Sequence, residues 1–430
     1  MASALCTVVP SQCGESFSLV AAESMSLGIP VIGSNIGGLG DLLRESGAGI
    51  AVNSSRSQEF IDAINTLKSD FLTQGPQVPL FEKVVSNYCD VAYGVAVNSA
   101  TSALHVACLA LGLAEGDYLW TSPNSFVASA NCGLYCGAQV NFVDIDQKSY
   151  NLSTKELEKK LIQAKQDNKL PKIVIPVHFS GQSCDMKRIH SLSIEYGFKI
   201  IEDASHAIGG KYLDKAIGGC QYSDITVFSF HPVKIITTAE GGLATTNDKD
   251  LFKRMQLFRS HGITRDPSLM TREIEGGWYY QQIDLGFNYR MTELQAALGI
   301  SQMERLDKFV IMRHELQIRY DILLKDLPVV VPFQSPDSYS SLHLYPIQIN
   351  YDDAGKSRHQ IFEKLRKGGI GVNVHYIPVH THPYYQKLGF RDGDFPNSEA
   401  YYKNAISMPL FNAMTFDQQD QVVEVLGKVI

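Results

Sequence analysis

From about Ala92, short apolar runs alternate with stretches of helical pattern along the chain. The runs read YGVAV, DYLWTS, QVNFVDI, KIVIPVHFSG, FKIIEDASH and ITVFSFHP, and stretches such as ALHVACLALGL and STKELEKKLIQAKQDN lie between them. Apolar runs of this kind are typical of strands that are buried on both faces. The pattern therefore predicts a three-layer α/β domain with helices on both faces of the sheet.

The composition changes on either side of this region. Residues 1 to about 55 are predicted to form a strand, a helix, a second strand and a loop, which is too little to build a sheet core alone. After about residue 310, an amphipathic helix and further strand and helix patterns predict a smaller α+β domain. We therefore expect boundaries that give segments 1–58, 59–310 and 311–430.

Charge and cysteine usage narrow the class of protein. The chain has 430 residues and a net charge of -7 with both signs mixed, which does not favour a nucleic-acid or membrane partner. No apolar run reaches the roughly 18 to 20 residues of a spanning helix, and the first residues lack the basic region of a signal peptide. Eight scattered cysteines without a CxxC pair fit reduced thiols, so we expect a cytoplasmic protein with no metal site.

Polar residues follow several predicted strands, at the sheet edge where such folds bind ligands. Ser99, Ala100 and Thr101 open a helix after YGVAV, and the free N–H groups there either bind a phosphate or are merely capped. Asp203 follows another strand. An acid at this place either caps a turn or is a buried carboxylate that pairs with a cationic partner. Each signal is weak when taken alone.

Lys234 lies in FSFHPVKIITTAEGG, between an apolar strand and a tight turn, although a lysine is usually exposed at the surface. Together with the anion site, the acid and Phe126, it supplies what pyridoxal phosphate needs. The phosphate needs N–H and hydroxyl donors, the ring nitrogen a carboxylate, the ring face a flat apolar neighbour, and the aldehyde an amine. The combination predicts a pyridoxal 5'-phosphate enzyme.

From about Ile61 to Ile430 the sequence resembles the DegT/DnrJ/EryC1/StrS sugar aminotransferases. The shared motifs keep their order and read SDFLTQGPQVPLFE, NSATSALHVA, TSPNSFVASAN, FVDID, IPVHFSGQ, IIEDASHAIGG, SDITVFSFHPVKIITTAEGG, RSHGI and GFNYRMTELQAALG. The resemblance implies the type I, aspartate aminotransferase-like fold of pyridoxal phosphate enzymes. A lysine at position 234, where dehydrating members carry histidine, favours transamination.

The resemblance implies a role for each matching residue of the cofactor site. Lys234 is expected to form the Schiff base with the cofactor and to carry protons as general base and acid. Asp203 is expected to pair with the ring nitrogen, and His206 to lie near the ring hydroxyl. Phe126 is expected to stack on the ring. The phosphate is assigned to Ala100, Thr101 and Ser229.

Other roles concern the partner subunit and the substrate. The resemblance implies that Asn288 reaches the phosphate of a neighbouring subunit in a homodimer, although the same residue could merely cap the helix that follows. Substrate contacts are expected from two segments and one serine: Asp70, Phe71, Leu72, Thr73, Ser99, His375, Tyr376, Ile377 and Pro378. For His375 the alternative is a strand residue on a solvated face.

Within the family, the segments WYYQQIDLGFNYRMTELQAALG, HGITRD, VHYIPVH and PYYQKLGF are similar to one subgroup. That subgroup transfers an amino group from L-glutamate to UDP-2-acetamido-2,6-dideoxy-β-L-arabino-hexos-4-ulose. The product is UDP-4-amino-4,6-dideoxy-N-acetyl-β-L-altrosamine, on the route to pseudaminic acid. Two alternatives stay open: another nucleotide 4-keto sugar, or a fusion product that binds the cofactor and turns over poorly.

The N-terminal segment is the reason for considering a fusion product that turns over poorly. Residues 1–55 resemble part of the C-terminal domain of retaining GT-B glycosyltransferases, with Glu15 and Glu23 at the E-x7-E spacing of that group. The aminotransferase family usually has a short substrate-binding arm before LTQG, and this chain has SGAGIAVNSS at that place. We therefore expect weakened substrate binding relative to the family.

Overall fold

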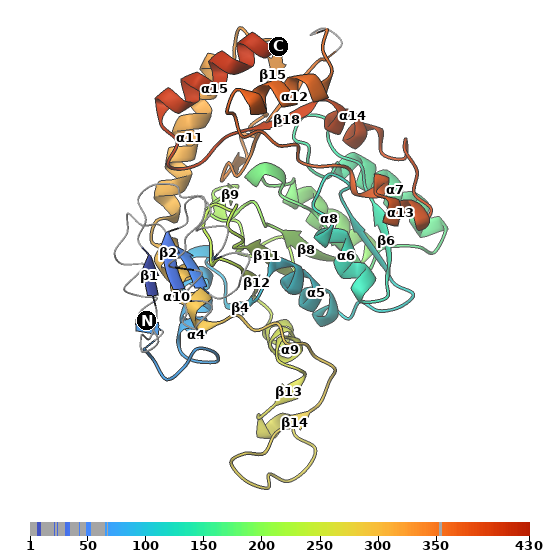
Figure 1. Ribbon diagram of the computed structural model, residues 1–430. Helices are drawn as coiled ribbons and strands as arrows, with labels where there is room; N and C mark the ends of the chain where they lie inside the picture. The colour runs from blue at the N-terminus through green and yellow to red at the C-terminus, as the bar shows by residue number, and fades with distance from the viewer. Residues whose placement is uncertain are drawn as a thin grey trace.

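The computed structural model describes residues 7–9, 21, 24, 31–34, 43, 49–52, 65–66, 68–351 and 355–430. Its centre is a seven-stranded sheet with the order β4-β12-β11-β8-β7-β5-β6 (Figure 1). The strands are β4 (Tyr93–Val97), β5 (Tyr118–Thr121), β6 (Gln139–Phe142), β7 (Ile173–Ile175), β8 (Lys199–Asp203), β11 (Ile225–Ser229) and β12 (Gly242–Thr246). All neighbours run parallel except β12, which lies antiparallel to both β4 and β11.

Helices cover both faces of this sheet. One face packs against α5 (Ala100–Ala110), α6 (Ala128–Tyr135) and α9 (Lys249–Arg259). The other face packs against α4 (Gln77–Cys89), α7 (Thr154–Gln166), α8 (Met186–Tyr196) and α10 (Glu293–Met303). In β4, Val95 and Val97 belong to the first core and Ala96 to the second, as expected for a strand buried on both sides. The predicted three-layer α/β fold is confirmed.

A second layer of structure lies above the sheet in Figure 1. It contains a small antiparallel sheet of β15 (Val329–Val330), β17 (Tyr345–Ile349) and β18 (Ala405–Met408). Helices α11 (Leu306–Leu323), α12 (Arg358–Lys367) and α15 (Phe416–Val429) share its core, and α13 (Pro383–Lys387) and α14 (Pro396–Asn404) lie nearer the main sheet. Because α11 runs across position 310, the boundary between segments 59–310 and 311–430 stays a prediction.

Three short features complete the main body. A hairpin of β13 (Ile263–Thr264) and β14 (Gln281–Gln282) projects away from the sheet, and we call residues 263–285 the hairpin arm (Figure 1). A small sheet joins β9 (Lys211–Tyr212), β10 (Lys215–Ala216) and β16 (Ser338–Tyr339). Single 3-10 turns are η1 (Phe179–Gly181), η2 (Pro267–Leu269) and η3 (Val379–Thr381).

The N-terminal segment contains a parallel sheet of β1 (Thr7–Val9), β2 (Val31–Ser34) and β3 (Gly49–Val52). The first two strands were predicted, whereas β3 was not, and it lies within the SGAGIAVNSS stretch. Glu15 and Glu23, on which the glycosyltransferase resemblance partly rests, lie outside the described residues. Across the part of the chain that the structure describes, we find no helix with the length and apolar character needed to cross a bilayer.

Candidate active site

The predicted phosphate site forms where three strands end side by side. Gly242 of β12 pairs with Ser229 of β11 on one side and with Val97 of β4 on the other. A Cβ atom on Gly242 would lie 2.4 Å from the carbonyl carbon of Ser99 and 2.5 Å from the nitrogen of Ala100. Only glycine therefore allows β12 to lie against the first turn of α5.

That first turn of α5 presents free donors. Ser99 caps the helix by accepting a 3.1 Å hydrogen bond from the N–H of Ser102. Among the described residues, the N–H groups of Ala100 and Thr101 have no acceptor. These two N–H groups lie beside Gly242, which pairs with Ser229, and N–H and hydroxyl donors of this kind suit an anion such as phosphate. We call this group of donors the cradle below.

Asp203 ends β8, next to β11 in the sheet. The hydroxyl of Ser129 donates to its Oδ2 at 2.6 Å, and the N–H of Ser205 donates to its Oδ1 at 3.1 Å. The carboxylate is 5% exposed, so these two hydrogen bonds fix its orientation at the buried end of the site. This geometry suits a carboxylate that pairs with a protonated ring nitrogen.

Lys234 lies in the turn that joins β11 to β12. Its N–H donates to the carbonyl of His231, and Thr238 closes the turn by donating its N–H to the carbonyl of Phe230 at 3.0 Å. Burial lowers the pKa of the Lys234 ammonium to about 8, and the charge of Asp203 opposes that shift. A lysine of this kind can hold or release a proton near neutral pH, as amine chemistry requires.

His206 and Tyr376 form a hydrogen-bonded pair beside Lys234. The N–H of Ser180 donates to His206 Nδ1 at 3.3 Å, so Nε2 carries the ring proton and donates to the Tyr376 hydroxyl at 3.0 Å. Burial, helped by Lys234 and His375, holds the pKa of His206 well below its usual range. The imidazole is therefore neutral, and the hydroxyl proton of Tyr376 is left to donate to a bound molecule.

The predicted segment 375–378 forms a wall of the site. His375 Nδ1 lies 2.8 Å from the hydroxyl of Ser407, and burial beside Lys234 lowers the pKa of His375 to about 4. The segment is anchored at its far end, where the N–H of Val379 donates to the carbonyl of Pro123. His375 thus points into the structure rather than lying on a solvated face.

His343 belongs to the same cluster, although it was not predicted as a site residue. Its ring centre lies 4.5 Å from that of His206, and its Nδ1 is buried without a hydrogen-bond partner among the described residues. Burial and the nearby cations and imidazoles hold the pKa of His343 well below its usual range. In the sequence it stands in a strand-like run, SLHLYPIQINY, in which a histidine reads as an ordinary core residue.

The second predicted substrate segment, 70–73, contacts the stretch of chain that begins α10. Thr73 forms a bridge to Thr292, and the N–H of Glu293 donates to the carbonyl of Leu72. The same stretch of chain reaches the cradle, because Arg290 forms a bridge to Val97. Phe71 and Leu72 are about half exposed and therefore accessible to a ligand.

Two predicted residues, Phe126 and Asn288, are exposed in the single chain. Phe126 is 60% exposed, as expected for a ring that needs a flat partner to cover it. Asn288 is also exposed and forms a bridge to Ser260, beside the hairpin arm. The roles predicted for both stay predictions.

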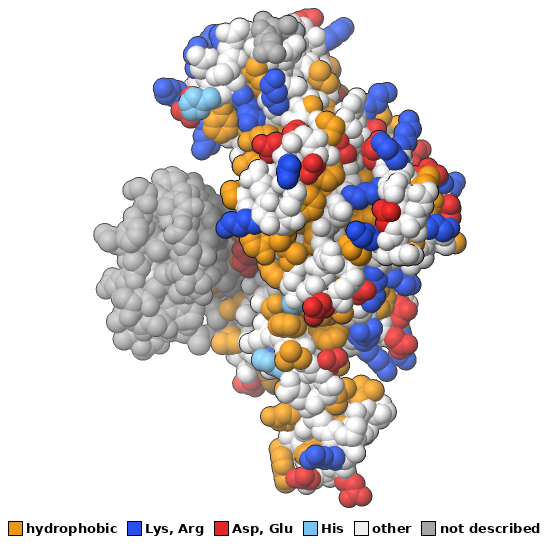
Figure 2. Space-filling model, turned by 90° about the vertical axis from the view of Figure 1, so that its right-hand side faces the viewer, with side chains coloured by type: hydrophobic (Ala, Val, Ile, Leu, Met, Phe, Trp, Pro, Cys, Tyr) orange, Lys and Arg blue, Asp and Glu red, His pale blue; other side chains and the backbone are white. Residues whose placement is uncertain are grey.

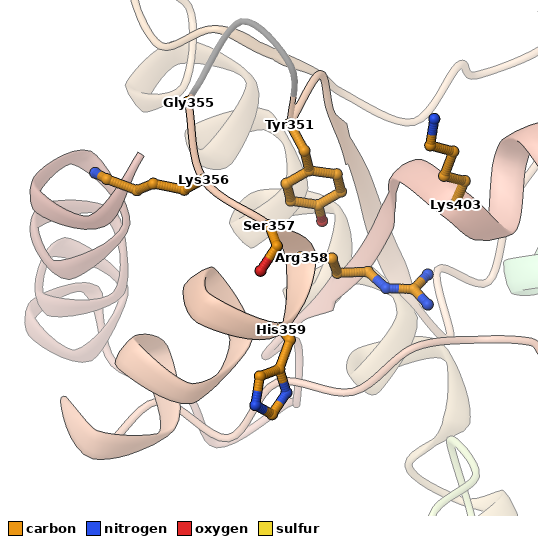
Figure 3. A pocket seen from close by; sticks show the side chains of 7 residues that line it. All are labelled: Tyr351, Gly355, Lys356, Ser357, Arg358, His359 and Lys403. Carbon is orange, nitrogen blue, oxygen red and sulfur yellow. The ribbon is translucent and has the colours of Figure 1, made fainter.

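A separate hollow lies in the upper layer, far along the chain from Lys234, and its lining side chains diverge (Figure 3). Lys356 points toward α15 and donates to the carbonyl of Val429 at 2.6 Å. Arg358 donates to the carbonyl of Tyr402 and lies over that ring. Because Lys356 and Arg358 already have protein partners and Lys403 points away from them, this hollow does not compete with the cluster around Lys234 as a candidate active site.

Comparison with known proteins decides the family. The model of the DegT/DnrJ/EryC1/StrS aminotransferase family matches residues 53–427. The chain belongs to this family. A second model, that of glycosyl transferases group 1, matches residues 1–74, in agreement with the resemblance of the N-terminal segment.

Several members of the family are similar over most of their length. The chain is 36% identical to the UDP-4-amino-4,6-dideoxy-N-acetyl-beta-L-altrosamine transaminase of Campylobacter jejuni, over 87% of this chain and 95% of the relative. It is 37% identical to the spore coat polysaccharide biosynthesis protein SpsC of Bacillus subtilis, over 87% and 94%. The solved structure of Helicobacter pylori PseC, an aminotransferase involved in the biosynthesis of pseudoaminic acid, superimposes with a TM-score of 0.79 at 31% identity and covers 86% and 96%.

This chain is a sugar aminotransferase that depends on pyridoxal phosphate, and similar structures have been solved in cofactor-bound forms. Its own residues fit that cofactor. The cradle has free donors and a glycine where a Cβ would intrude, and a buried carboxylate and a lysine with a lowered pKa lie beyond it. When bound, the cofactor supplies an electron sink and a carrier for the amino group.

Replacement of Gly242 by alanine tests the cradle. The new Cβ would push β12 away from α5, and we expect the affinity for pyridoxal phosphate to fall about tenfold or more, since overpacking of this kind costs about 1–3 kcal/mol. Titration of the purified protein with cofactor, followed by absorbance, measures this. Gly427→Ala is the control, because its Cβ would come only within 3.6 Å of Leu327; equal affinities for the two variants would refute the cradle.

Replacement of Asp203 by asparagine tests the electrostatics of Lys234. The Asp203 carboxylate raises the pKa of Lys234 against burial, so its removal should move that pKa from about 8 to a lower value. The rate at which trinitrobenzenesulfonate modifies Lys234 in cofactor-free protein, followed against pH, reports the change. Asp224→Asn, which removes the partner of Lys199, should leave the profile unchanged. A profile in Asp203→Asn that is unshifted or shifted upward contradicts the assignment.

Proposed function

We propose that this chain transfers the amino group of L-glutamate to C4 of UDP-2-acetamido-2,6-dideoxy-β-L-arabino-hexos-4-ulose. The product would be UDP-4-amino-4,6-dideoxy-N-acetyl-β-L-altrosamine, a precursor of pseudaminic acid, made in the cytoplasm. The observation that carries this proposal is the similarity, over 375 residues, to two Campylobacter jejuni transaminases named for that product. The likeness to Helicobacter pylori PseC supports the same substrate class.

The proposed chemistry assigns one task to each part of the cluster. Lys234 moves the proton, because with a pKa of about 8 about one side chain in ten is neutral at pH 7. Asp203, held by Ser129 and Ser205, keeps a proton on the ring nitrogen of the cofactor. The cradle anchors the phosphate. The Tyr376 hydroxyl, whose pKa is raised by burial, stays protonated and donates to the substrate or to the cofactor.

The substrate is proposed to enter between two walls. Segment 70–73 lies on one side, with the exposed side chains of Phe71 and Leu72, and segment 375–378 lies on the other. The neutral imidazole of His375 offers a hydrogen-bonding group that repels no cation and attracts no anion. Polar groups of this kind select a sugar by its hydroxyl and amide pattern.

Two alternatives remain as outcomes of the test. The first alternative is a different nucleotide 4-keto sugar, and it is supported because a relative named for spore coat polysaccharide biosynthesis, SpsC, is as similar to this chain as the Campylobacter enzymes. The position of β3, in the stretch where the family has its substrate-binding arm, favours a fusion product with weak turnover.

The test supplies purified protein with pyridoxal phosphate, L-glutamate and UDP-4-keto sugars, and measures the aminated product by mass spectrometry. We expect amination of the named substrate, and a loss of about 10²–10⁴-fold or more in kcat for Lys234→Ala, because that residue carries the proton. Lys325→Ala, at an exposed position just beyond the end of α11, is the control. Preference for another sugar, or cofactor binding without turnover, selects one of the two alternatives.

We also propose that the working unit is a homodimer with shared active sites, in which Asn288 reaches the cradle of the partner. Asn288 is exposed in the single chain, and the hairpin arm beside it carries exposed apolar side chains, including Trp278 and Leu285, each 73% exposed. The space-filling view shows hydrophobic side chains along this projection (Figure 2). An apolar arm next to an exposed polar residue suits contact with a second copy.

A mixing experiment tests the shared site. Lys234→Ala and Asn288→Ala homodimers should each be impaired, whereas a dimer that contains one chain of each retains one site with both side chains. Partial unfolding and refolding of the mixture should therefore raise the specific activity above the mean of the two variants.

Light scattering of the native protein tests the oligomeric state separately and should give twice the chain mass. Activity that stays at the mean, or a monomeric mass, contradicts the proposal.

A further inference from the structure

A buried histidine and glutamate lie behind β8, on the face of the sheet that the candidate active site does not use. His178 follows shortly after β7, and Glu202 lies in β8 directly before Asp203. His178 is 0% exposed and Glu202 is 5% exposed. Because successive side chains of a strand point to opposite faces of a sheet, Glu202 points away from the side that holds the Asp203 carboxylate. We call His178 and Glu202 the buried pair.

Each polar atom of the buried pair has a hydrogen-bond partner. The N–H of Cys184 donates to His178 Nδ1 at 3.2 Å, so Nε2 carries a ring proton and donates to Glu202 Oε2 at 2.7 Å. The hydroxyls of Ser223 and Thr226 donate to Oε1. Burial raises the pKa of Glu202, but the hydrogen bonds from His178, Ser223 and Thr226 outweigh that effect and hold this pKa below its usual value. Glu202 is therefore a carboxylate held in one orientation.

The backbone holds the same stretch of chain against the end of β8. The N–H of His178 donates to the carbonyl of Asp203 at 3.0 Å, and the N–H of Asp203 donates to the carbonyl of Pro176 at 2.9 Å. Val177 forms a parallel bridge to Asp203 between these two bonds. Residues 176–178 are thus fixed by the backbone on one side and by the buried pair on the other, and they lead directly into η1.

Ser180, in the middle of η1, has an uncommon backbone conformation. Its φ angle is 63°, in the left-handed region that serine rarely adopts. In this conformation its N–H donates to His206 Nδ1 at 3.3 Å, and its carbonyl accepts the N–H of His343 at 2.9 Å. Its hydroxyl donates to the carbonyl of Leu344 at 2.6 Å. A residue keeps such a conformation only where its surroundings hold it. Here the buried pair holds the chain before Ser180, and residues 343–344 hold Ser180 itself.

We propose that His178 and Glu202 are positioning residues, which act through Ser180 to keep the ring proton of His206 on Nε2. Because the Ser180 N–H occupies Nδ1, a neutral His206 donates from Nε2 to the Tyr376 hydroxyl. If the buried pair is broken, the left-handed turn can relax, the Ser180 N–H moves away, and the ring proton is free to move to Nδ1. Tyr376 would then donate its own proton to Nε2, and a bound molecule would lose that donor. The inference rests on the role proposed for Tyr376.

The test locates the ring proton of His206 by NMR of the full chain, with ¹⁵N-labelled histidine and no cofactor. Correlations from the carbon-bound ring protons to the two nitrogens distinguish Nε2–H from Nδ1–H, and His206→Gln identifies the signals. We expect a single Nε2–H form in the wild-type chain. Glu202→Leu, which cannot accept from His178, should give a mixture of both tautomers. Glu202→Gln, whose amide oxygen can still accept from His178, should keep the wild-type pattern.

Two further variants complete the test. His178→Asn keeps an acceptor for the N–H of Cys184 but is too short to reach Glu202, so it breaks the buried pair even if Glu202→Leu does not fold. Glu399→Leu is the matched control, because Glu399 lies 2.9 Å from the buried imidazole of His380 in a second histidine–glutamate pair. A single Nε2–H form in every folded variant of the buried pair overturns the proposal. The same mixture of tautomers in Glu399→Leu also overturns it.

Turnover separates this inference from the proposed function. With cofactor, L-glutamate and the sugar supplied, we expect kcat to fall in Glu202→Leu and to stay near the wild-type value in Glu202→Gln. A mixture of tautomers without a fall in kcat would contradict the role proposed for the Tyr376 hydroxyl, while the control of the His206 proton by the buried pair would stand.

Discussion

The antiparallel insertion of β12 between β4 and β11 is the contact on which the rest of the site depends. It brings Gly242 against the first turn of α5, and it places Ser229 and the Lys234 turn on the other side of that glycine. If β12 ran parallel to β11, the chain would have to cross to the other end of the strands before β12 began. The short turn that carries Lys234 would then not exist. The distance between the cradle and the amine is therefore set by backbone pairing rather than by side-chain packing.

The charges of the site follow from burial. Three imidazoles, those of His206, His343 and His375, have lowered pKa values and are neutral near pH 7. The groups around Lys234 are therefore neutral imidazole rings and the carboxylate of Asp203. The protonation state of Lys234 then depends mainly on the charge of the molecule that binds beside it. An environment with few fixed charges suits a lysine that must take up and give back a proton within one reaction cycle.

Sequence reasoning was strongest where local pattern and packing agree. YGVAV is β4 residue for residue, since a run that is apolar throughout is buried on both faces wherever it lies in the sheet. Strand β12 was not predicted, because the residues of GLATT are small and polar for a central strand. No role was predicted for His343 or Ser129. Those roles depend on contacts such as that of Ser129 with Asp203, 74 positions apart, which no local pattern contains. The pair of Tyr376 and His206, 170 positions apart, is hidden for the same reason.

The anchoring of Val379 on Pro123 has a consequence for how the protein is made. All seven strands of the sheet, the cradle and Lys234 have left the ribosome once Thr246 is free, and α9 and α10, which complete the two covering layers, follow within about sixty residues. The wall of residues 375–378 appears more than a hundred residues later and must fold back onto a loop made long before. The residues predicted to hold the cofactor phosphate are therefore synthesised well before the segment predicted to contact the sugar.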